Sequence, residues 1–306
     1  MDALVVILAG GVGERLWPLS TPERPKYLLK IGGISLIELA FRRGLLLGDA
    51  ANIFVSTSQS NCANIQKAIP MLPKANIIAE PFVKNTATAI CLSNEVLYHR
   101  FGSRPIIFMP SDSVIDAKNS FVDALVSAMA FVSAGNKMTV IGVSPWNIST
   151  QYGYIRIGSA MDRDKKIFSV DRFVEKPDRM TAKSYVQSDK YLWNTGMVIS
   201  TTGFIQEAFR LYAQNIYEDV AKYIDGDNRA YGLSKGASFD RVILEKLKTL
   251  SVMVGDFGWE DVGSFEILAK YSSAKYLGLY KILNFALQKR WLLQPGRTGC
   301  TPSSIG

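Results

Sequence analysis

The chain has 306 residues, of which 48% are hydrophobic and 20% charged, and a formal net charge of +8 at pH 7. This composition is typical of a globular protein that can bury a full core, and it excludes disorder, collagen and coiled coil. The three cysteines, Cys62, Cys91 and Cys300, are widely spaced and form no closely spaced pair. That spacing excludes a disulfide framework and a cysteine metal site, and it fits a reducing compartment.

The positive charge is concentrated at the C-terminal end. The last 34 residues hold five Lys and Arg and no Asp or Glu, so they contribute +5 and the first 272 residues contribute +3. The main body therefore lacks the basic footprint of a nucleic-acid-binding protein. No uncharged apolar run reaches the roughly 18 residues of a membrane span, and the apolar run after Asp2 is a poor signal peptide. We expect a cytoplasmic protein with no membrane span and no nucleic-acid partner.

The first half of the chain alternates apolar, β-rich runs with helical patterns. Each apolar run is nearly continuous, as in a strand buried on both faces of a parallel sheet. Strands are predicted at 3–9, 53–57, 76–80, 105–112 and 138–145, and helices at 35–47, 61–68, 86–100 and 120–133. The alternation predicts a doubly wound α/β fold.

The pattern changes after about Ser144. The segments 152–158 and 167–177 alternate in polarity, which is typical of antiparallel or edge strands. They predict a mixed sheet with an inserted lobe on the substrate side. Helical patterns return at 202–213 and 239–247, and a last apolar strand is predicted at 250–257.

A glycine-rich turn follows the first predicted strand in AGGVGERLWPLS, residues 9–20. Glycines at this point let backbone N–H groups approach a phosphate, because no Cβ intervenes. Leu16 stands where a dinucleotide fingerprint needs its third glycine, and no Walker A sequence is present. Arg15 and Lys26 add positive charge that could hold a triphosphate. The competing interpretation is a tight turn with surface cations.

Eight segments, in order along the chain, together resemble one family. They are AGGVGERLWPLS with RPKYLL, EPFVKNTATA, MPSDSVI, YGYIRIG, FVEKPD, WNTGM, SFDRVILEK and GWEDVGSF, and they span about the first 270 residues. This set resembles the sugar-1-phosphate nucleotidyltransferases and, within them, the mannose-1-phosphate guanylyltransferases.

The resemblance implies a Rossmann-like nucleotidyltransferase α/β/α domain over residues 1–272. Its sheet would be mixed and mostly parallel, with an antiparallel insertion on the sugar side. The implied reaction is transfer of a nucleotidyl group from GTP to mannose 1-phosphate, giving GDP-mannose and pyrophosphate with Mg²⁺. The sugar phosphate would attack the α-phosphate in line and needs no general base, so a catalytic His is not expected. We interpret the one histidine, His99, as structural.

The resemblance also assigns roles to residues. Asp112 and Asp261 follow predicted strands and are the implied metal ligands, with a turn or cap role as the alternative. Ser113 stands where relatives usually have His, which makes the contacts beside Asp112 uncertain. The remaining implied site residues are Arg15, Lys26 and Lys176 for charge neutralisation, Leu8, Gly10, Gly11, Gly13, Glu80, Asn85 and Thr86 for the nucleotide, and Gly153, Glu175 and Asn194 for the sugar.

For some of these residues another interpretation remains open. Asn85 or Thr86 could cap a helix, and capping and binding can coexist. Glu175 and Lys176 could be a surface ion pair, and Asn194 a turn residue. The sequence also leaves open a catalytically silent or truncated homologue that binds GDP-mannose in a regulatory role, and an enzyme of the same fold that uses glucose 1-phosphate.

The resemblance fades after about Tyr271. Residues 273–306 are basic and acid-free, where relatives continue with a β-rich segment used in subunit contacts. One hypothesis is a truncated or frame-shifted end. Another is a basic amphipathic helix at about 276–293 that contacts an anionic membrane or a partner. A homodimer is possible, weakened by the altered C-terminus.

Overall fold

The structure is a computed structural model that describes residues 3–135 and 137–272. A nine-stranded sheet forms its centre, in the order β5-β4-β1-β6-β11-β8-β12-β10-β9. The strands of this sheet are β1 (Leu4–Ala9), β4 (Ile53–Ser58), β5 (Ile77–Glu80), β6 (Pro105–Pro110), β8 (Thr139–Val143), β9 (Tyr154–Asp162), β10 (Ile167–Val174), β11 (Tyr191–Thr201) and β12 (Ser251–Gly255). Two small sheets pair β2 (Lys30–Ile31) with β3 (Ile34–Ser35), and β7 (Ser113–Ile115) with β13 (Trp259–Asp261).

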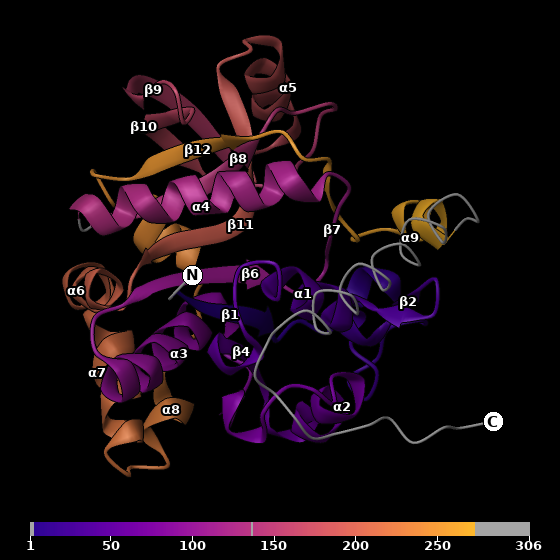
Figure 1. The fold of residues 1–306 in the computed structure, drawn as a ribbon, viewed down its shortest axis with the longest axis vertical. Coiled ribbons are helices and arrows are strands. Elements are labelled where there is room, and N and C mark those ends of the chain that lie inside the picture. The colour runs from indigo at the N-terminus through magenta and orange to yellow at the C-terminus, as the bar shows by residue number, and fades with distance from the viewer. Residues whose placement is uncertain (1–2, 136, 273–306) are drawn as a thin grey trace, which may run out of the picture.

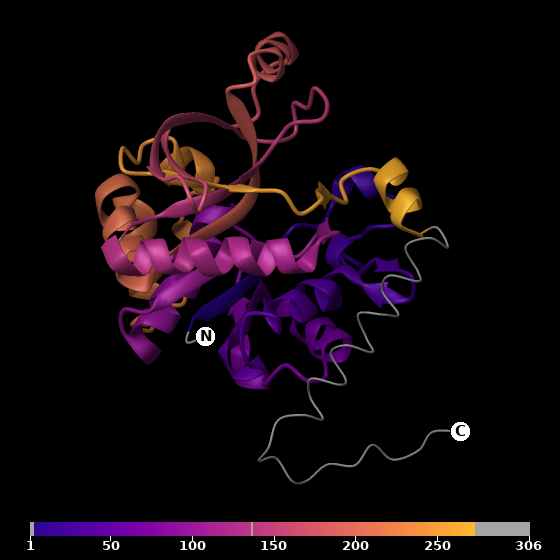
Figure 2. The same ribbon diagram turned by 45° about the horizontal axis from the view of Figure 1, so that its top comes forward.

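Helices cover both faces of the large sheet (Figures 1 and 2). They are α1 (Leu36–Gly44), α2 (Cys62–Ala68), α3 (Asn85–Phe101), α4 (Lys118–Gly135), α5 (Arg179–Gln187), α6 (Thr202–Tyr212), α7 (Gln214–Ile224), α8 (Ala230–Leu233) and α9 (Phe265–Ser272). No helix within the described ranges is both long and apolar enough to cross a membrane.

The two faces of the sheet have separate hydrophobic cores because successive strand residues point to opposite sides. In β1, Val5 and Ile7 pack with α1, α2 and α4. Leu4 and Val6 pack with α3, α6 and α7 on the other face. The expected α/β/α layering is therefore confirmed.

The sheet is mixed, as expected, with four parallel and five antiparallel strand pairings. Only β10 and β11 run opposite to the other seven strands of this sheet. Strand β11 lies between β6 and β8 and is antiparallel to both. Its pairing is interrupted between Asn194 and Val198, where Gly196 has a φ of 75°.

The predicted helix at 239–247 is wrong in length and type. The structure forms a short π-helical turn, Asp240–Leu244, with a hydrogen bond from the Glu245 N–H to the Asp240 carbonyl. This bond spans five residues rather than four, so the turn is wider than an α-helical one. Helices α5, α7, α8 and α9 and the short strands were not predicted from the sequence. The WNTGM segment, interpreted above as a sugar-site motif, is part of the long strand β11.

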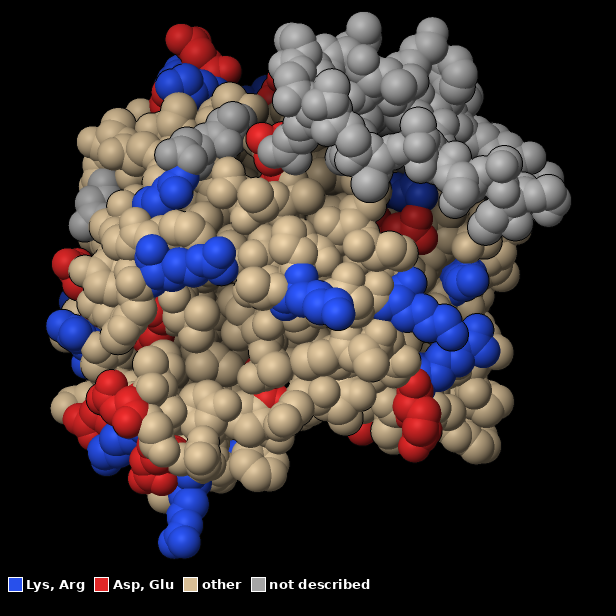
Figure 3. Space-filling view, turned by 60° about the horizontal axis from the view of Figure 1, so that its bottom comes forward, with Lys and Arg blue, Asp and Glu red and all other residues tan. Residues whose placement is uncertain are grey.

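Charged side chains are dispersed on the face shown in Figure 3. Lys and Arg side chains are spread over this face, with a few lying close together at its right side, and Asp and Glu side chains gather chiefly at the lower left and lower right. The predictions about residues 273–306, including the helix at 276–293, lie outside the described residues.

Candidate active site

A cavity of about 550 Å³ opens at the carboxyl ends of β1, β4, β5 and β6. The chain moves outward from β1 to β4 and β5 and then returns to place β6 on the other side of β1. Ligands in open α/β sheets bind at such a switch point. Ten of the predicted site residues line this cavity: Leu8, Gly10, Gly11, Gly13, Arg15, Lys26, Glu80, Asn85, Thr86 and Asp112.

Lys26 lies between two aspartates at one end of the cavity. Its Nζ is 2.8 Å from Oδ2 of Asp112 and 2.7 Å from Oδ1 of Asp261. Asp112 follows β6 and Asp261 ends β13, and the pairing of β13 with β7 brings them together: Asp261 is opposite Ser113, and the Val262 N–H donates to the Asp112 carbonyl at 3.0 Å.

The electrostatics of this ionic cluster (Lys26, Asp112, Asp261) follow from burial and from sharing one cation. Burial alone would lower the pKa of Lys26, but the two carboxylates outweigh it and raise that pKa. Burial also raises the pKa of Asp261, the charge of Asp112 adds to the rise, and Lys26 and Arg15 act against it. The cluster thus holds two carboxylates against one buried ammonium group.

Gly13 supports the position of Lys26. Its φ is 81°, and a Cβ built on it would clash with the Cβ of Lys26. The Ser20 hydroxyl donates to the Gly13 carbonyl at 2.5 Å, and the Lys26 N–H donates to the Val12 carbonyl at 3.0 Å. A glycine is required here both by the backbone conformation and by the contact.

Arg15 stands at the rim beside the ionic cluster. One guanidinium nitrogen is 3.8 Å from Oδ2 of Asp261, and another donates to the Gln151 side-chain oxygen at 3.0 Å. The Arg15 side chain is 55% exposed, so its charge is available to a molecule entering the cavity.

At the opposite end, Glu80 is buried at the end of β5. Its Oε1 accepts from the Ser56 hydroxyl at 3.2 Å, and its Oε2 accepts from the Tyr231 hydroxyl at 2.9 Å. Burial raises the pKa of Glu80, and these two hydrogen bonds act against that rise. No Lys or Arg forms an ion pair with Glu80 among the described residues.

Asn85 and Thr86 begin α3, and their side chains bond locally. Asn85 has a φ of 71°, and its side-chain oxygen accepts from the Thr86 N–H at 2.7 Å. The Thr86 hydroxyl accepts from the Phe239 N–H at 2.9 Å. Both residues also line the cavity, so a local structural role and a place in the site coexist.

The predicted sugar residues form a second group beside the cavity. Asn194 donates to Oδ1 of Asp240 at 2.8 Å, and its side-chain oxygen accepts from the Gly196 N–H at 3.2 Å. A Cβ on Gly153 would lie 2.9 Å from Oε2 of Glu175, so the carboxylate packs directly on this glycine. Asn194 lies on β11, not in a turn.

Lys176 is not brought to the ionic cluster. Its Nζ pairs with Oε1 of Glu175 at 2.8 Å, and its side chain is 53% exposed. Neither Lys176, Glu175, Gly153 nor Asn194 lines the cavity. The Glu175–Lys176 ion pair expected as an alternative is therefore present.

Three residues of the site, Asp240, Tyr231 and Gln151, were not predicted from the sequence. Asp240 lines the cavity and bonds Asn194, and burial together with the charge of Glu175 raises its pKa to about 6. It lies within the SFDRVILEK motif, so the sequence did mark the segment that contains Asp240. Tyr231 and Gln151 join the site across sequence separations of 151 and 136 residues, and no local pattern marks them.

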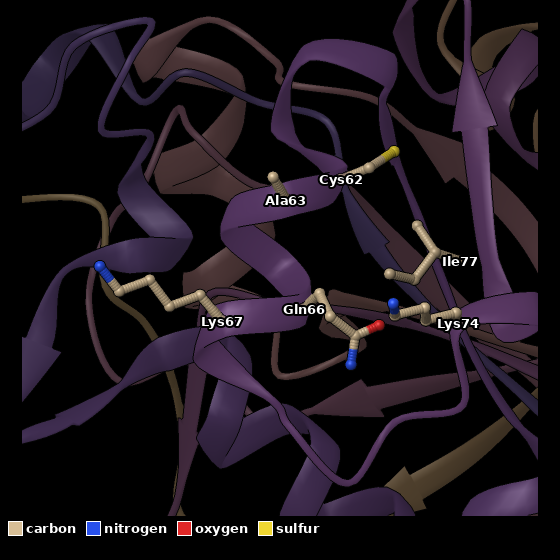
Figure 4. Close-up of a pocket in the computed structure, with 6 residues that line it drawn as sticks. All are labelled: Cys62, Ala63, Gln66, Lys67, Lys74 and Ile77. Carbon is tan, nitrogen blue, oxygen red and sulfur yellow. The ribbon is translucent and has the colours of Figure 1, made fainter.

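A second cavity lies on the surface around α2 and contains none of these groups. It is lined by Cys62, Ala63, Gln66, Lys67, Lys74 and Ile77, with Lys67 pointing away from the other labelled side chains (Figure 4). Burial raises the pKa of the Cys62 thiol, which makes the thiol less nucleophilic at neutral pH. In the described part of the chain, its lining contains no carboxylate and no histidine.

The fold and the cavity are those of a nucleotidyltransferase. Residues 4–276 match the nucleotidyl transferase family, and the chain belongs to that family. The chain is 34% identical over 278 residues to a mannose-1-phosphate guanylyltransferase of Salmonella muenchen, covering 86% of this chain and 58% of that protein. It is 33% identical over 283 residues to one of Escherichia coli, covering 86% and 60%. The chain thus spans less than two thirds of these relatives.

A solved structure has the same arrangement of elements. The crystal structure described as mannose-1-phosphate geranyltransferase from Thermus thermophilus superposes with a TM-score of 0.80 at 26% identity, covering 89% of this chain and 80% of that one. The expected nucleotidyltransferase fold is confirmed.

Proposed function

We propose that this chain transfers a guanylyl group from GTP to mannose 1-phosphate, giving GDP-mannose and pyrophosphate. The observation that carries the proposal is the ionic cluster of Lys26, Asp112 and Asp261 at one end of a glycine-lined cavity that reaches Glu80 at the other. The names of the relatives support the choice of substrates. The homodimer suggested by the resemblance stays a prediction.

Asp112 and Asp261 would hold a divalent cation, for which Mg²⁺ is our choice. Within the described residues, no three His, Cys, Asp or Glu side chains gather closely enough to bind a metal by themselves. The two carboxylates nevertheless fit Mg²⁺, which commonly takes one or two carboxylates together with substrate phosphates. That both contact a single Lys26 nitrogen indicates that one cation can reach both. When bound, the metal would neutralise charge on the phosphates.

The chain's own residues would orient the triphosphate. Backbone N–H groups of the turn from Gly10 to Gly13 approach it without interference from a Cβ, and Arg15 at the rim adds a permanent charge. Lys26, beside the two aspartates, would neutralise phosphate charge. Glu80, Asn85 and Thr86 would bind the base and ribose at the other end of the cavity.

The sugar phosphate would bind on the β11 side. Asn194, held by Asp240, and Glu175, packed on Gly153, would bind its hydroxyls. Lys176 would have to leave Glu175 to reach the phosphate, and its 53% exposure leaves it free to do so. The sugar phosphate is already a nucleophile, so the protein's contribution is alignment and charge stabilisation.

Pyrophosphate release by the full chain tests this proposal. The assay contains Mg²⁺ with mannose 1-phosphate or glucose 1-phosphate, and GTP is compared with UTP, dTTP, CTP and ATP. We expect release with GTP and mannose 1-phosphate. Folded protein that releases none with any pair, yet binds GDP-mannose, would instead be a silent homologue.

A further inference from the structure

Among residues 3–135 and 137–272, only hydroxyl groups hold the buried carboxylate of Glu80. Ser56 and Tyr231 each donate to a different oxygen of this carboxylate, at 3.2 and 2.9 Å. Glu80 is 2% exposed and lines the cavity. A buried carboxylate without a cation is costly, so its retention at a cavity wall calls for a partner that supplies hydrogen-bond donors.

Tyr231 is fixed in place by a segment that is hydrogen-bonded both to the loop after Glu80 and to the first turn of α3. The Lys84 Nζ donates to the Gly232 carbonyl at 2.6 Å, and the Ala87 N–H donates to the Ala237 carbonyl at 3.0 Å. Tyr231 itself is fully buried, and its ring packs against Tyr223 with centroids 5.3 Å apart. Figure 1 shows α8, which carries Tyr231, beside α7. The Tyr231 hydroxyl therefore has little freedom to move.

In this arrangement each oxygen of the Glu80 carboxylate can still accept a further hydrogen bond. An ionised carboxylate has about four lone-pair sites, and the two hydroxyls occupy one on each oxygen. Two neighbouring acceptors then remain. A protonated carboxyl group would offer one donor and one acceptor instead. The hydrogen bonds from the two hydroxyls stabilise the ionised form and so disfavour protonation.

We propose that Tyr231, with Ser56, is a positioning residue for base selection: the two hydroxyls hold Glu80 as a pair of acceptors that favours guanine. This rests on the proposed function, which puts the base at this end of the cavity. Guanine presents two adjacent donors, N1–H and the 2-amino group. Adenine presents a ring acceptor beside its amino donor, so pairing with an ionised carboxylate leaves a group unmatched.

Equilibrium binding to the full chain, without any sugar phosphate, tests the inference. GTP, ITP and ATP are the probes, since ITP keeps N1–H and lacks the 2-amino group. The wild-type chain should bind GTP more tightly than ITP, and ITP more tightly than ATP. Tyr231→Phe keeps the ring and removes the hydroxyl, and it should lower the ratio of GTP to ATP affinity about tenfold with ATP binding unchanged.

Two further variants keep the result interpretable. Ser56→Ala removes the other hydroxyl donor and should lower the same ratio even if Tyr231→Phe folds poorly. Tyr223→Phe removes a neighbouring hydroxyl for which the described residues provide no hydrogen-bond partner, and it should leave the ratio unchanged.

The outcomes separate the two proposals. Wild-type preference for GTP together with an unchanged ratio in Ser56→Ala and in folded Tyr231→Phe would overturn this inference alone. So would equal binding of GTP and ATP by the wild type. A folded wild-type chain that binds none of the three nucleotides would overturn both this inference and the proposed function.

Discussion

The site holds carboxylates of two kinds, and their surroundings differ. Asp112 and Asp261 share the ammonium group of Lys26, so one positive charge offsets part of their negative charge. Glu80 is held by two hydroxyls, and Asp240 by a hydroxyl and an amide, with no cation from the described part of the chain in hydrogen-bond contact. The first kind suits exchange with another cation, whereas the second suits recognition of uncharged donors.

The largest effect on turnover is expected from removing the charge of either Asp112 or Asp261. Asp112→Asn or Asp261→Asn should lower turnover by about 10²–10³-fold, the usual cost of losing one preorganised charge contact. The measurement is pyrophosphate release with GTP and mannose 1-phosphate. Glu260→Gln is the matched control, because Glu260 adjoins Asp261 on β13 but pairs with Lys270 at 2.6 Å. Near-normal turnover in an aspartate variant would reject its role.

Removing the shared cation should expose the repulsion it suppresses. Lys26→Met leaves two facing carboxylates with only the guanidinium of Arg15, 3.8 Å from Asp261, to offset their charge, and it should lower the free energy of unfolding by about 3 kcal/mol. Mg²⁺ should restore more stability to this variant than to the wild type, because no ammonium competes for the carboxylates. Urea unfolding with and without Mg²⁺ measures both effects, and equal Mg²⁺ stabilisation of the two proteins would contradict the competition.

Substitutions at Gly13 and Gly11 should distinguish effects on stability from effects on nucleotide binding. Gly13→Ala drives a Cβ into the Lys26 side chain and forces a φ of 81° on alanine, so it should destabilise the fold by about 2 kcal/mol. Gly11→Ala meets nothing within 4 Å and should leave stability unchanged. If this loop binds phosphates, Gly11→Ala should still weaken GTP binding. Thermal unfolding and equilibrium binding distinguish the two effects, and equal stability of the two variants would contradict the packing argument.

Asp240, a carboxylate of the second kind, should make the free energy of unfolding depend on pH. Burial raises the pKa of Asp240 to about 6 from 3.8, with Glu175 adding to the rise and Lys176 opposing it. Between these values the unfolded chain binds fewer protons than the folded one, so this group's contribution to stability falls as pH rises through the interval. Asp240→Asn should flatten that part of the profile in urea unfolding. An unchanged slope would contradict the assignment.

Much of the fold could be predicted because buried parallel strands are continuous apolar runs. The segments that became β1, β4, β5, β6 and β8 were located from that signal alone. Strand β11 was missed because Asn194 and Gly196 are typical turn residues. Here Gly196 instead allows the irregularity that separates the two paired stretches of the strand.

Site residues could be predicted where a charged side chain ends or follows a strand. They could not be predicted where only the tertiary fold brings two distant side chains into contact. Asp112 and Asp261 could be placed because each ends or follows a strand. Tyr231 could not, since a tyrosine in a short helix carries no local mark of a carboxylate 151 residues earlier. Asp240 lay within a recognised motif, but its partner Asn194 is 46 residues away.

The contact between Lys26 and Asp261 has a consequence for when the site can form during synthesis. These residues are 235 positions apart, and Asp261 is held by pairing between β13 and β7. Contacts between distant residues form late, because the loop entropy must be lost before they stabilise the chain. During synthesis, the ionic cluster cannot form until residue 261 has emerged from the ribosome. A nascent chain that has already folded its first strands would therefore lack the complete ionic cluster until then.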